Sequence, residues 1–259
     1  MSLLSRFRKS PTISTTSMDS QPSPISPIET PRTDLRAEGA RRDAFIIDLI
    51  RRFGLLTSDL IQQRVANQFS LTSQHNILNR LKVLTERKEI YNLGRIASGH
   101  IVYGARPLKG RRHISHDLSV GRFGITLDGV ATMENWCCDQ ATLQEERKQG
   151  ERPFIPDARF ILNGIQHFLE VHTGSQGEEV LVSKLRAYKK HHESIKQLAK
   201  IEPTLTTKIR VLFICQREGN VEKILQIISK IYGDSMLFWV GQEEAYRENP
   251  DAVLALFTR

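Results

Sequence analysis

Cysteine is scarce in this sequence, and long apolar runs are absent. The three cysteines, Cys137, Cys138 and Cys215, are odd in number, and none has the CxxC spacing of a zinc or redox motif. This pattern predicts a reduced, cytoplasmic protein without a zinc site. No apolar run approaches the roughly 18–20 residues that span a bilayer, so contact with a membrane is not expected. The first ten residues, MSLLSRFRKS, are too polar for a secretory signal.

Residues 1–33 lack the apolar periodicity of a folded segment. They are dense in serine, threonine and proline instead. Such a composition does not bury enough apolar surface to offset the entropy that ordering costs. We therefore predict a disordered tail over residues 1–33.

Acidic residues are few in the first part of the chain. The 259 residues carry a net charge of +8, and this charge is unevenly distributed. Residues 1–112 contain 19 Lys and Arg against 9 Asp and Glu, a net charge of +10, whereas residues 113–259 contain 18 against 20, a net charge of −2. The asymmetry predicts a nucleic-acid-binding module joined to a module with a different task. A solvated basic surface is the alternative.

Helical spacing of apolar residues begins near Asp34 and predicts a winged helix-turn-helix domain over residues 34–105. The first helix ends at Gly54, a second is capped by Thr57 or Ser58, and a third starts near residue 73. Short strands at 90–93 and 100–103, joined by a turn rich in small residues, form a hairpin, or wing, directly after the third helix. Winged helices bind duplex DNA by laying the third helix in the major groove.

The polar residues of the third helix and the wing are therefore candidate DNA contacts. Asn, Gln and Arg suit base edges, and Lys and Arg suit phosphates. The candidates on and just after the helix are Gln74, His75, Asn76, Asn79, Arg80, Lys82, Arg87 and Lys88. Arg95 at the wing and Arg111 and Arg112 in a basic linker, residues 106–115, extend the set. The alternatives are a purely solvated helix face and a protein–protein contact.

Residues 116–259 predict a three-layer α/β domain with a mixed sheet. A helix starting near His116 leads into two alternating strands that flank Asn163-Gly164, a strong hairpin signal. A long amphipathic helix from about residue 178 to 198 follows, and residues 209–215 form a nearly continuous apolar run typical of a buried strand. Asn220 is expected to cap a further helix, before a last strand at 235–240.

Two carboxylates on the hairpin strands indicate a site. Asp157 and Glu170 are able to project from one end of the sheet, where a pair of carboxylates about 4–6 Å apart would bind Mg²⁺. Lys184 on the following helix is placed to stabilise phosphate charge, with Tyr188 on the same helix face. His172 shares the strand face of Glu170 and is a further candidate as a base or as a ligand of a softer metal. A structural Glu170–Lys184 salt bridge is the alternative.

These motifs resemble known families. Pro156-Asp157 followed by Glu170-x-His172 resembles the PD-(D/E)xK nuclease superfamily, with His in place of Lys. As a set, they resemble the replication-relaxation family of plasmid and mobile-element proteins over roughly residues 40–240. The motifs that carry this resemblance are His116-Asp117-Leu118, Pro156-Asp157-Ala158, the segment from Phe168 to Ser175, and Lys184-Leu185-Arg186-Ala187-Tyr188. The resemblance implies a winged helix, a restriction-endonuclease-like α/β domain over residues 116–259, and a role in plasmid replication and DNA relaxation.

Two departures from the family pattern bear on catalysis. His172 stands where the family has an acid, and Ser175 where it has a threonine. We therefore predict a non-enzymatic, DNA-binding accessory protein for replication, DNA relaxation or mobilisation, with a degenerate nuclease-like domain and no cofactor. One alternative is a Mg²⁺-dependent endonuclease or nickase using Asp157, Glu170 and Lys184. Another is a winged-helix transcription regulator with a dimerisation domain. Double-stranded DNA is the expected partner, and replication or mobilisation proteins and a second copy of the chain are further candidates.

Overall fold

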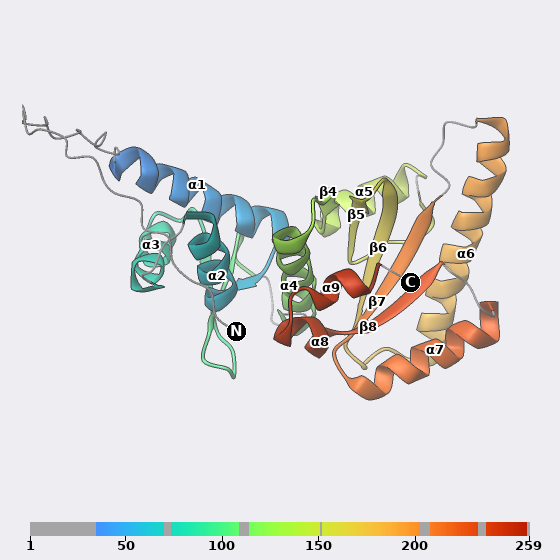
Figure 1. Cartoon of the computed structure of the whole chain (residues 1–259). Coiled ribbons are helices and arrows are strands. Elements are labelled where there is room, and N and C mark those ends of the chain that lie inside the picture. The colour runs from blue at the N-terminus through green and yellow to red at the C-terminus, as the bar shows by residue number, and fades with distance from the viewer. Residues whose placement is uncertain are drawn as a thin grey trace, which may run out of the picture. The chain divides into compact units, whose positions relative to one another are not determined.

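The computed structural model describes residues 35–69, 74–108, 114–150, 152–202, 208–232 and 237–257 (Figure 1). The tail expected at residues 1–33 lies outside the described residues. Residues 36–259 form one compact unit. No described helix has the length and apolar character needed to cross a membrane.

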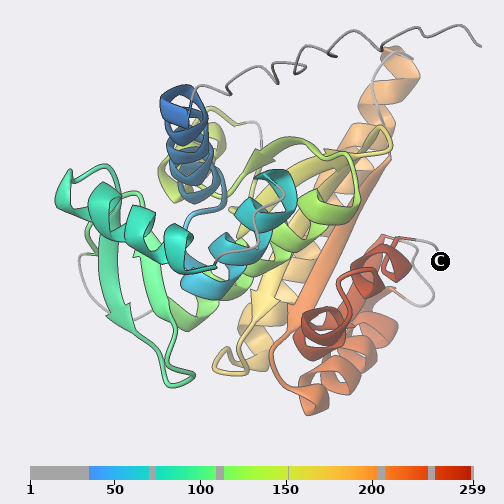
Figure 2. The ribbon, with the colours of Figure 1, turned by 60° about the vertical axis from the view of Figure 1, so that its left-hand side comes forward.

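The first half of this unit combines three helices with a small antiparallel sheet. Its elements are α1 (Leu35–Phe53), β1 (Leu56–Thr57), α2 (Ser58–Phe69), α3 (Gln74–Glu86), β2 (Tyr91–Arg95) and β3 (Ile101–Gly104). The three strands are ordered β1-β3-β2, and β2 and β3 form a hairpin directly after α3 (Figure 2). Gly54 follows α1 with a φ of +81°, a left-handed conformation that glycine adopts without steric cost.

The three predicted helices of this half are confirmed, but the predicted cap of α2 and part of the apolar face of α3 are wrong. The Thr57 hydroxyl has no hydrogen-bond partner within the described residues, and the Ser58 hydroxyl accepts from the backbone N–H of Ile101. Ile77, Leu81 and Leu84 are buried, as their helical spacing requires. Leu78 was expected to point inward but is 40% exposed. The side chain of Leu78 lies one position round the helix from Ile77, outside the stripe that faces α1 and α2.

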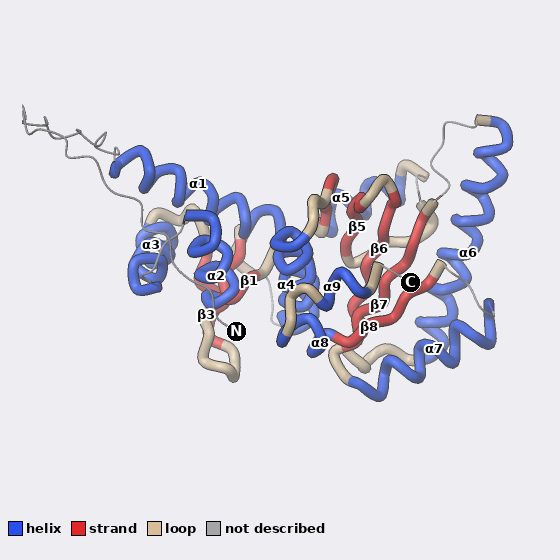
Figure 3. The backbone as a smooth tube through the Cα atoms, viewed as in Figure 1, coloured by secondary structure: helices blue, strands red, loops and turns tan. Residues whose placement is uncertain are grey.

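The second half is built on a five-stranded sheet ordered β4-β5-β6-β7-β8 (Figure 3). Its elements are α4 (Ile114–Val130), β4 (Glu134–Cys137), α5 (Gln140–Lys148), β5 (Ala158–Leu162), β6 (Ile165–His172), α6 (Glu178–Ile201), β7 (Ile209–Cys215), α7 (Glu218–Tyr232), β8 (Phe238–Gln242), α8 (Glu243–Glu248) and α9 (Ala252–Ala255). Strands β4, β5 and β6 are antiparallel neighbours, whereas β6, β7 and β8 run parallel. The chain therefore has the predicted mixed sheet and belongs to the α+β class.

Helices cover both faces of this sheet. Side chains of α6 and α7 pack on one face, against residues such as Phe168, Val211 and Phe213. Helix α4 lies on the other face with α8 and α9 (Figure 1). The parallel strands are buried on both sides, which explains why β7 reads as an unbroken apolar run in the sequence.

The hairpin between β5 and β6 sets the register of the later site. Asn163 and Gly164 both have positive φ, 53° and 70°, as the expected two-residue turn requires. Leu162 pairs with Ile165, and the ladder continues to Ala158 opposite Leu169. The residues just beyond this last pair, Asp157 and Glu170, therefore lie on neighbouring strands.

Two details of the second half differ from the prediction. Strand β4 was not expected, because Glu134 and Asn135 interrupt its apolar pattern and it lies at the edge of the sheet. Asn220 was expected to cap the last long helix, but α7 begins at Glu218 and includes it.

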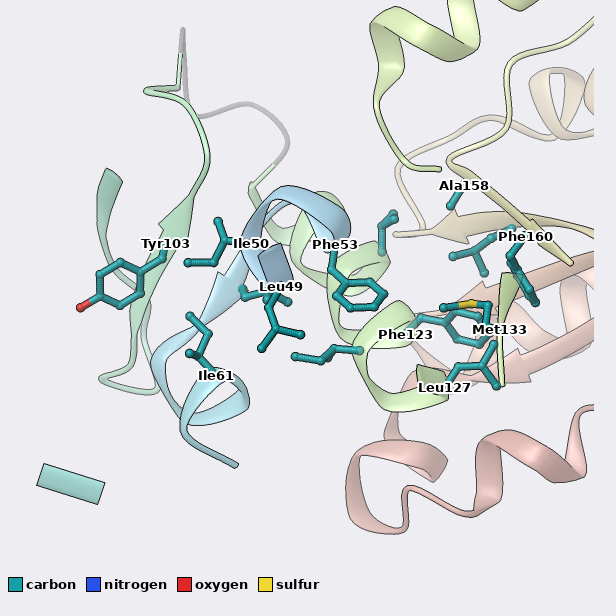
Figure 4. Close-up of a cluster of buried hydrophobic side chains, with 14 of the residues drawn as sticks. Leu49, Ile50, Phe53, Ile61, Tyr103, Phe123, Leu127, Met133, Ala158 and Phe160 are labelled. Atoms are coloured by element: carbon teal, nitrogen blue, oxygen red, sulfur yellow. The ribbon is translucent and has the colours of Figure 1, made fainter. Parts of the chain in front are cut away.

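A continuous core joins the two halves. Phe53 at the end of α1 lies 5.7 Å, ring to ring, from Trp136 on β4, and Phe123 of α4 contacts the same indole. Figure 4 shows this cluster running from Leu49 and Ile50 of α1 through Phe53 to Phe123 and Phe160. Helix α4 packs closely against the backbone that follows α1. This contact depends on Gly121, because a Cβ there would lie 2.2 Å from the carbonyl oxygen of Leu55.

Candidate functional site

Asp157 and Glu170 lie side by side where β5 begins and β6 nears its end. The backbone N–H of Asp157 donates to the carbonyl oxygen of Leu169 at 3.0 Å, which extends the β5–β6 ladder by one residue. Three further side chains reach this pair, from α4 and α6. We call the five residues Asp157, Glu170, His116, Lys184 and Tyr188 the carboxylate centre.

Glu170 is fully enclosed by side chains of α6. Its Oε2 accepts a hydrogen bond from the Lys184 ammonium at 2.5 Å, and its Oε1 accepts one from the Tyr188 hydroxyl at 2.5 Å. Its side chain is 3% exposed. Burial, together with the nearby charge of Asp157, raises the pKa of Glu170 to about 7, although Lys184 and Tyr188 act in the opposite direction. Glu170 is thus an acid that titrates near neutral pH.

Asp157 is held by donors from α4 and β6. Its Oδ2 accepts from the backbone N–H of Val171 at 2.7 Å and lies 3.0 Å from Nε2 of His116. Burial alone would raise the pKa of Asp157, but the hydrogen bond and charge of His116 outweigh it and lower that pKa. Asp157 is therefore an ionised carboxylate with a cationic neighbour.

His116 lies between two carboxylates. Its other ring nitrogen, Nδ1, is 3.0 Å from Oδ1 of Asp117. Burial would lower the pKa of His116, but the hydrogen bonds to Asp117 and Asp157 prevail and raise it to about 10. His116 is consequently an imidazolium that donates from both nitrogens. Its motif, His116-Asp117-Leu118, was visible in the sequence, but no spacing rule connects residue 116 with residue 157.

His172 lies near the carboxylate centre, but no hydrogen bond or ion pair among the described residues joins it to Asp157 or Glu170. It ends β6 on the same strand face as Glu170 and is 4% exposed. Burial lowers the pKa of His172, and the cations Lys223 and Lys184 lower it further. Its Nδ1 has no hydrogen-bond partner among the described side chains and backbone groups. His172 is therefore a neutral, buried imidazole.

The carboxylate centre does not fit the divalent cation that the nuclease resemblance implies. A hard cation such as Mg²⁺ takes several oxygen ligands at once. Both oxygens of Glu170 already accept hydrogen bonds, and Oδ2 of Asp157 faces His116 and Val171. Among the described residues, no three His, Cys, Asp or Glu side chains gather in a way that could hold a metal ion. The negative charges of Asp157 and Glu170 are instead balanced by the positive charges of His116 and Lys184.

Most of the candidate DNA contacts that the structure describes are exposed, and one of them, Arg80, forms an ion pair within the protein. Asn76, Asn79 and Lys82 are exposed along one face of α3, and Arg87 and Lys88 are exposed in the turn that follows. Arg95 is exposed on β2, where it donates to the carbonyl oxygen of Gly99 at 2.6 Å. Gln74 and His75 lie in the first turn of α3, while Arg111 and Arg112 lie outside the described residues.

Arg80 differs from the rest of that set. Its guanidinium forms a two-point ion pair with Asp43 of α1, with Nε 2.9 Å from Oδ1 and the second nitrogen bonded to Oδ2. The hydrogen bond to Asp43 raises the pKa of Arg80, although burial acts in the opposite direction. Arg80 therefore fixes α3 against α1. Its partner lies 37 residues away, and no local pattern of residues predicts the contact.

The two sets of candidate residues thus have different chemistry. The carboxylate centre holds two acids and two cations in closed pairs and is able to hold a proton on Glu170 near neutral pH. The face of α3 presents amides and a lysine to solvent. No family model, no curated protein and no solved structure matches this chain.

Proposed function

We propose that this protein binds duplex DNA through α3 and the β2–β3 hairpin. The observation that carries the proposal is the exposed face of α3, where Asn76, Asn79 and Lys82 point away from the core. Amide side chains are suited to adenine edges, and lysine to phosphate. The exposed Leu78 adds an apolar group of the kind that contacts a thymine methyl.

The order of the elements supports a winged helix. Three helices with a short strand after the first are followed by a hairpin that pairs with that strand. In such a domain the third helix enters the major groove and the hairpin touches the backbone or the minor groove. The exposed guanidinium of Arg95 on the hairpin suits this second contact.

The local charge balance supports the same assignment. Asp43 of α1, which contacts α3, forms an ion pair with Arg80. Glu86 lies at the end of the helix, where its carboxylate is 4.0 Å from the ammonium of Lys82, and the exposed Arg87 and Lys88 follow it. The exposed face of α3 is therefore neutral to basic, as a phosphate-contacting surface needs to be.

For the second half we propose a nuclease-derived domain that has lost catalysis. The order of α4, three antiparallel strands, α6 and a parallel strand suits a restriction-endonuclease-like core. The ion pairs of Glu170 with Lys184 and of Asp157 with His116 occupy the groups that a metal would need. Together with the resemblance to the replication-relaxation family, these features support an accessory role in replication, relaxation or mobilisation of a plasmid or mobile element.

The DNA-binding proposal is tested by fluorescence anisotropy with a labelled duplex over a series of salt concentrations. We expect log Kd to depend linearly on log salt, and the slope to fall by about 1 when Lys82→Ala removes one phosphate contact. The matched control is Lys196→Ala, which removes an exposed helical lysine of α6. Salt-independent binding, or equal slopes for the two variants, would overturn the assignment of α3.

A metal-dependent endonuclease is the second candidate function, because Asp157, Glu170 and Lys184 do lie together. It predicts that the protein nicks supercoiled plasmid in Mg²⁺ or Mn²⁺ and that Asp157→Ala abolishes nicking. The closed ion pairs make the absence of nicking the expected result.

A further inference from the structure

A cavity of about 610 Å³ lies where the two halves of the chain meet. It is lined by the end of α1, the segment that follows β3, the start of α4, the turn before α5, and Asp157. Its volume falls in the range of about 300–1,000 Å³ that is usual for small-molecule sites. Two of the lining segments, α1 and the continuation of β3, belong to the half that carries the proposed DNA-binding face.

The charged groups of this cavity are not equally available. Asp117 and Asp157 both contact His116, and Asp139 accepts hydrogen bonds from the backbone and hydroxyl of Thr142 at the start of α5. Every acid that lines the cavity thus has a partner. Arg51 and Arg106 also line it, and neither has a side-chain hydrogen bond or ion pair within the described part of the chain.

The cavity also has an apolar side. Pro107 and Leu108 are exposed beside Arg106, and Leu108 is 36% exposed. Leu55 and Val120 close the bottom. Two free guanidinium groups therefore flank an accessible apolar wall.

We propose that this cavity takes a single unpaired nucleotide of a DNA strand that is bound at α3, an inference that rests on the proposed function. Arg51 and Arg106 hold the phosphate, because guanidinium groups match phosphate oxygens with paired donors. The base lies against Pro107 and Leu108. In a duplex the face of each base is covered by its stacked neighbours, so a base lies against Pro107 and Leu108 only when its nucleotide has left the helix.

Both parts of the site are needed for this assignment. A plain anion site would not require the apolar wall, and a purely apolar ligand would leave two cations without partners. An unpaired nucleotide uses both the two arginines and the apolar wall. Proteins bind single-stranded nucleic acid through basic side chains that contact the phosphates and an apolar or aromatic surface that contacts the base. The position of Arg51 on α1 and of Arg106 just after β3 places the site beside the elements proposed to hold the duplex.

The experiment compares an intact duplex with the same duplex carrying a single-nucleotide gap, which leaves one base unpaired. Wild-type protein is expected to bind the gapped DNA on the order of tenfold more tightly, the scale of one base contact. Arg51→Ala combined with Arg106→Ala is expected to remove this preference and leave affinity for the intact duplex unchanged. Arg41→Ala is the matched control, because Arg41 is an exposed arginine of the same helix that does not line the cavity.

The outcomes separate this inference from the proposed function. Equal wild-type affinity for the two DNAs, or a preference that survives the double variant, overturns the cavity assignment while duplex binding stands. Loss of the preference in Arg41→Ala as well would show a general charge effect and would also overturn it. Binding of free deoxythymidine monophosphate as tightly as the gapped duplex would identify a mononucleotide site instead. No salt-dependent binding to either DNA would remove the proposed function itself.

Discussion

Replacing Glu170 with glutamine should change how the stability of the protein depends on pH. Glu170 is 2% exposed, and burial with the adjacent charge of Asp157 raises its pKa from 4.5 to about 7. In the unfolded chain this group has its ordinary pKa. Between these two values the folded protein holds a proton that the unfolded chain has released.

The sign and size of the effect follow from this difference. Since the folded state binds the proton more tightly, Glu170 lowers the free energy of unfolding as pH rises from 4.5 to about 7. Each pKa unit corresponds to about 1.4 kcal/mol, so the whole window amounts to about 3 kcal/mol. Glutamine does not titrate, so Glu170→Gln should gain about 3 kcal/mol relative to wild type across this window. The difference should be constant below and above it.

Urea unfolding of both proteins at a series of pH values measures this difference directly. Titrating groups that do not interact with Glu170 cancel in the comparison, because they are present in both proteins. Asp157 and Lys184 do interact with Glu170, but the pKa of Asp157 is lowered and that of Lys184 is raised, so both groups titrate outside the window from pH 4.5 to about 7. Glu222→Gln on α7 is the control for the chemical change from carboxylate to amide, since Glu222 is an exposed glutamate outside the carboxylate centre. A pH-independent difference between wild type and Glu170→Gln would refute the raised pKa and, with it, the buried arrangement of Glu170.

Two further predictions follow from contacts of the same region. Added Mg²⁺ or Mn²⁺ should leave the melting temperature unchanged and supercoiled plasmid uncut, because Glu170 has no free oxygen for a cation; a rise in melting temperature that Asp157→Ala removes would contradict this. Gly121→Ala should lower the free energy of unfolding by about 3 kcal/mol or more, because its Cβ would lie 2.2 Å from the carbonyl oxygen of Leu55. Gly129→Ala in the same helix meets no atom within 4 Å, so in urea unfolding it should be neutral or stabilising by about 0.5–1 kcal/mol.

Elements with a strong local pattern could be predicted from the sequence. The turn at Asn163-Gly164 and the buried strand Ile209–Cys215 were located to the residue, because turn chemistry and an unbroken apolar run act over a few neighbouring positions. The apolar face of α6 was likewise visible in Leu181, Leu185 and Tyr188, but Val180, which was predicted to belong to the same face, is 50% exposed. Strand β4 was missed because its place in the sheet depends on pairing with β5 and not on a pattern of its own.

The partners within the site could be predicted only in part. Glu170 and Lys184 are connected by the hairpin and one helix, so their proximity followed from local structure, and a salt bridge was one of the two alternatives considered. The contact of His116 with Asp157 and that of Arg80 with Asp43 depend on how separate elements pack. No periodicity in the sequence encodes such packing, and both contacts alter the roles that the residue types alone had indicated.

The two neighbouring acids of the carboxylate centre are each stabilised by a positively charged neighbour. Asp157 raises the pKa of Glu170, so each acid needs a positive neighbour, and α4 and α6 supply one each. Helix α4 therefore has two tasks, because it carries His116 and also packs Gly121 against the turn after α1. A displacement of α4 would have two effects at once. It would move His116 away from Asp157, and it would disturb the packing of α4 against the half of the chain that contains α3. Loss of DNA binding in Gly121→Ala would thus reflect altered packing, and only exposed side chains such as Lys82 test the DNA contact itself.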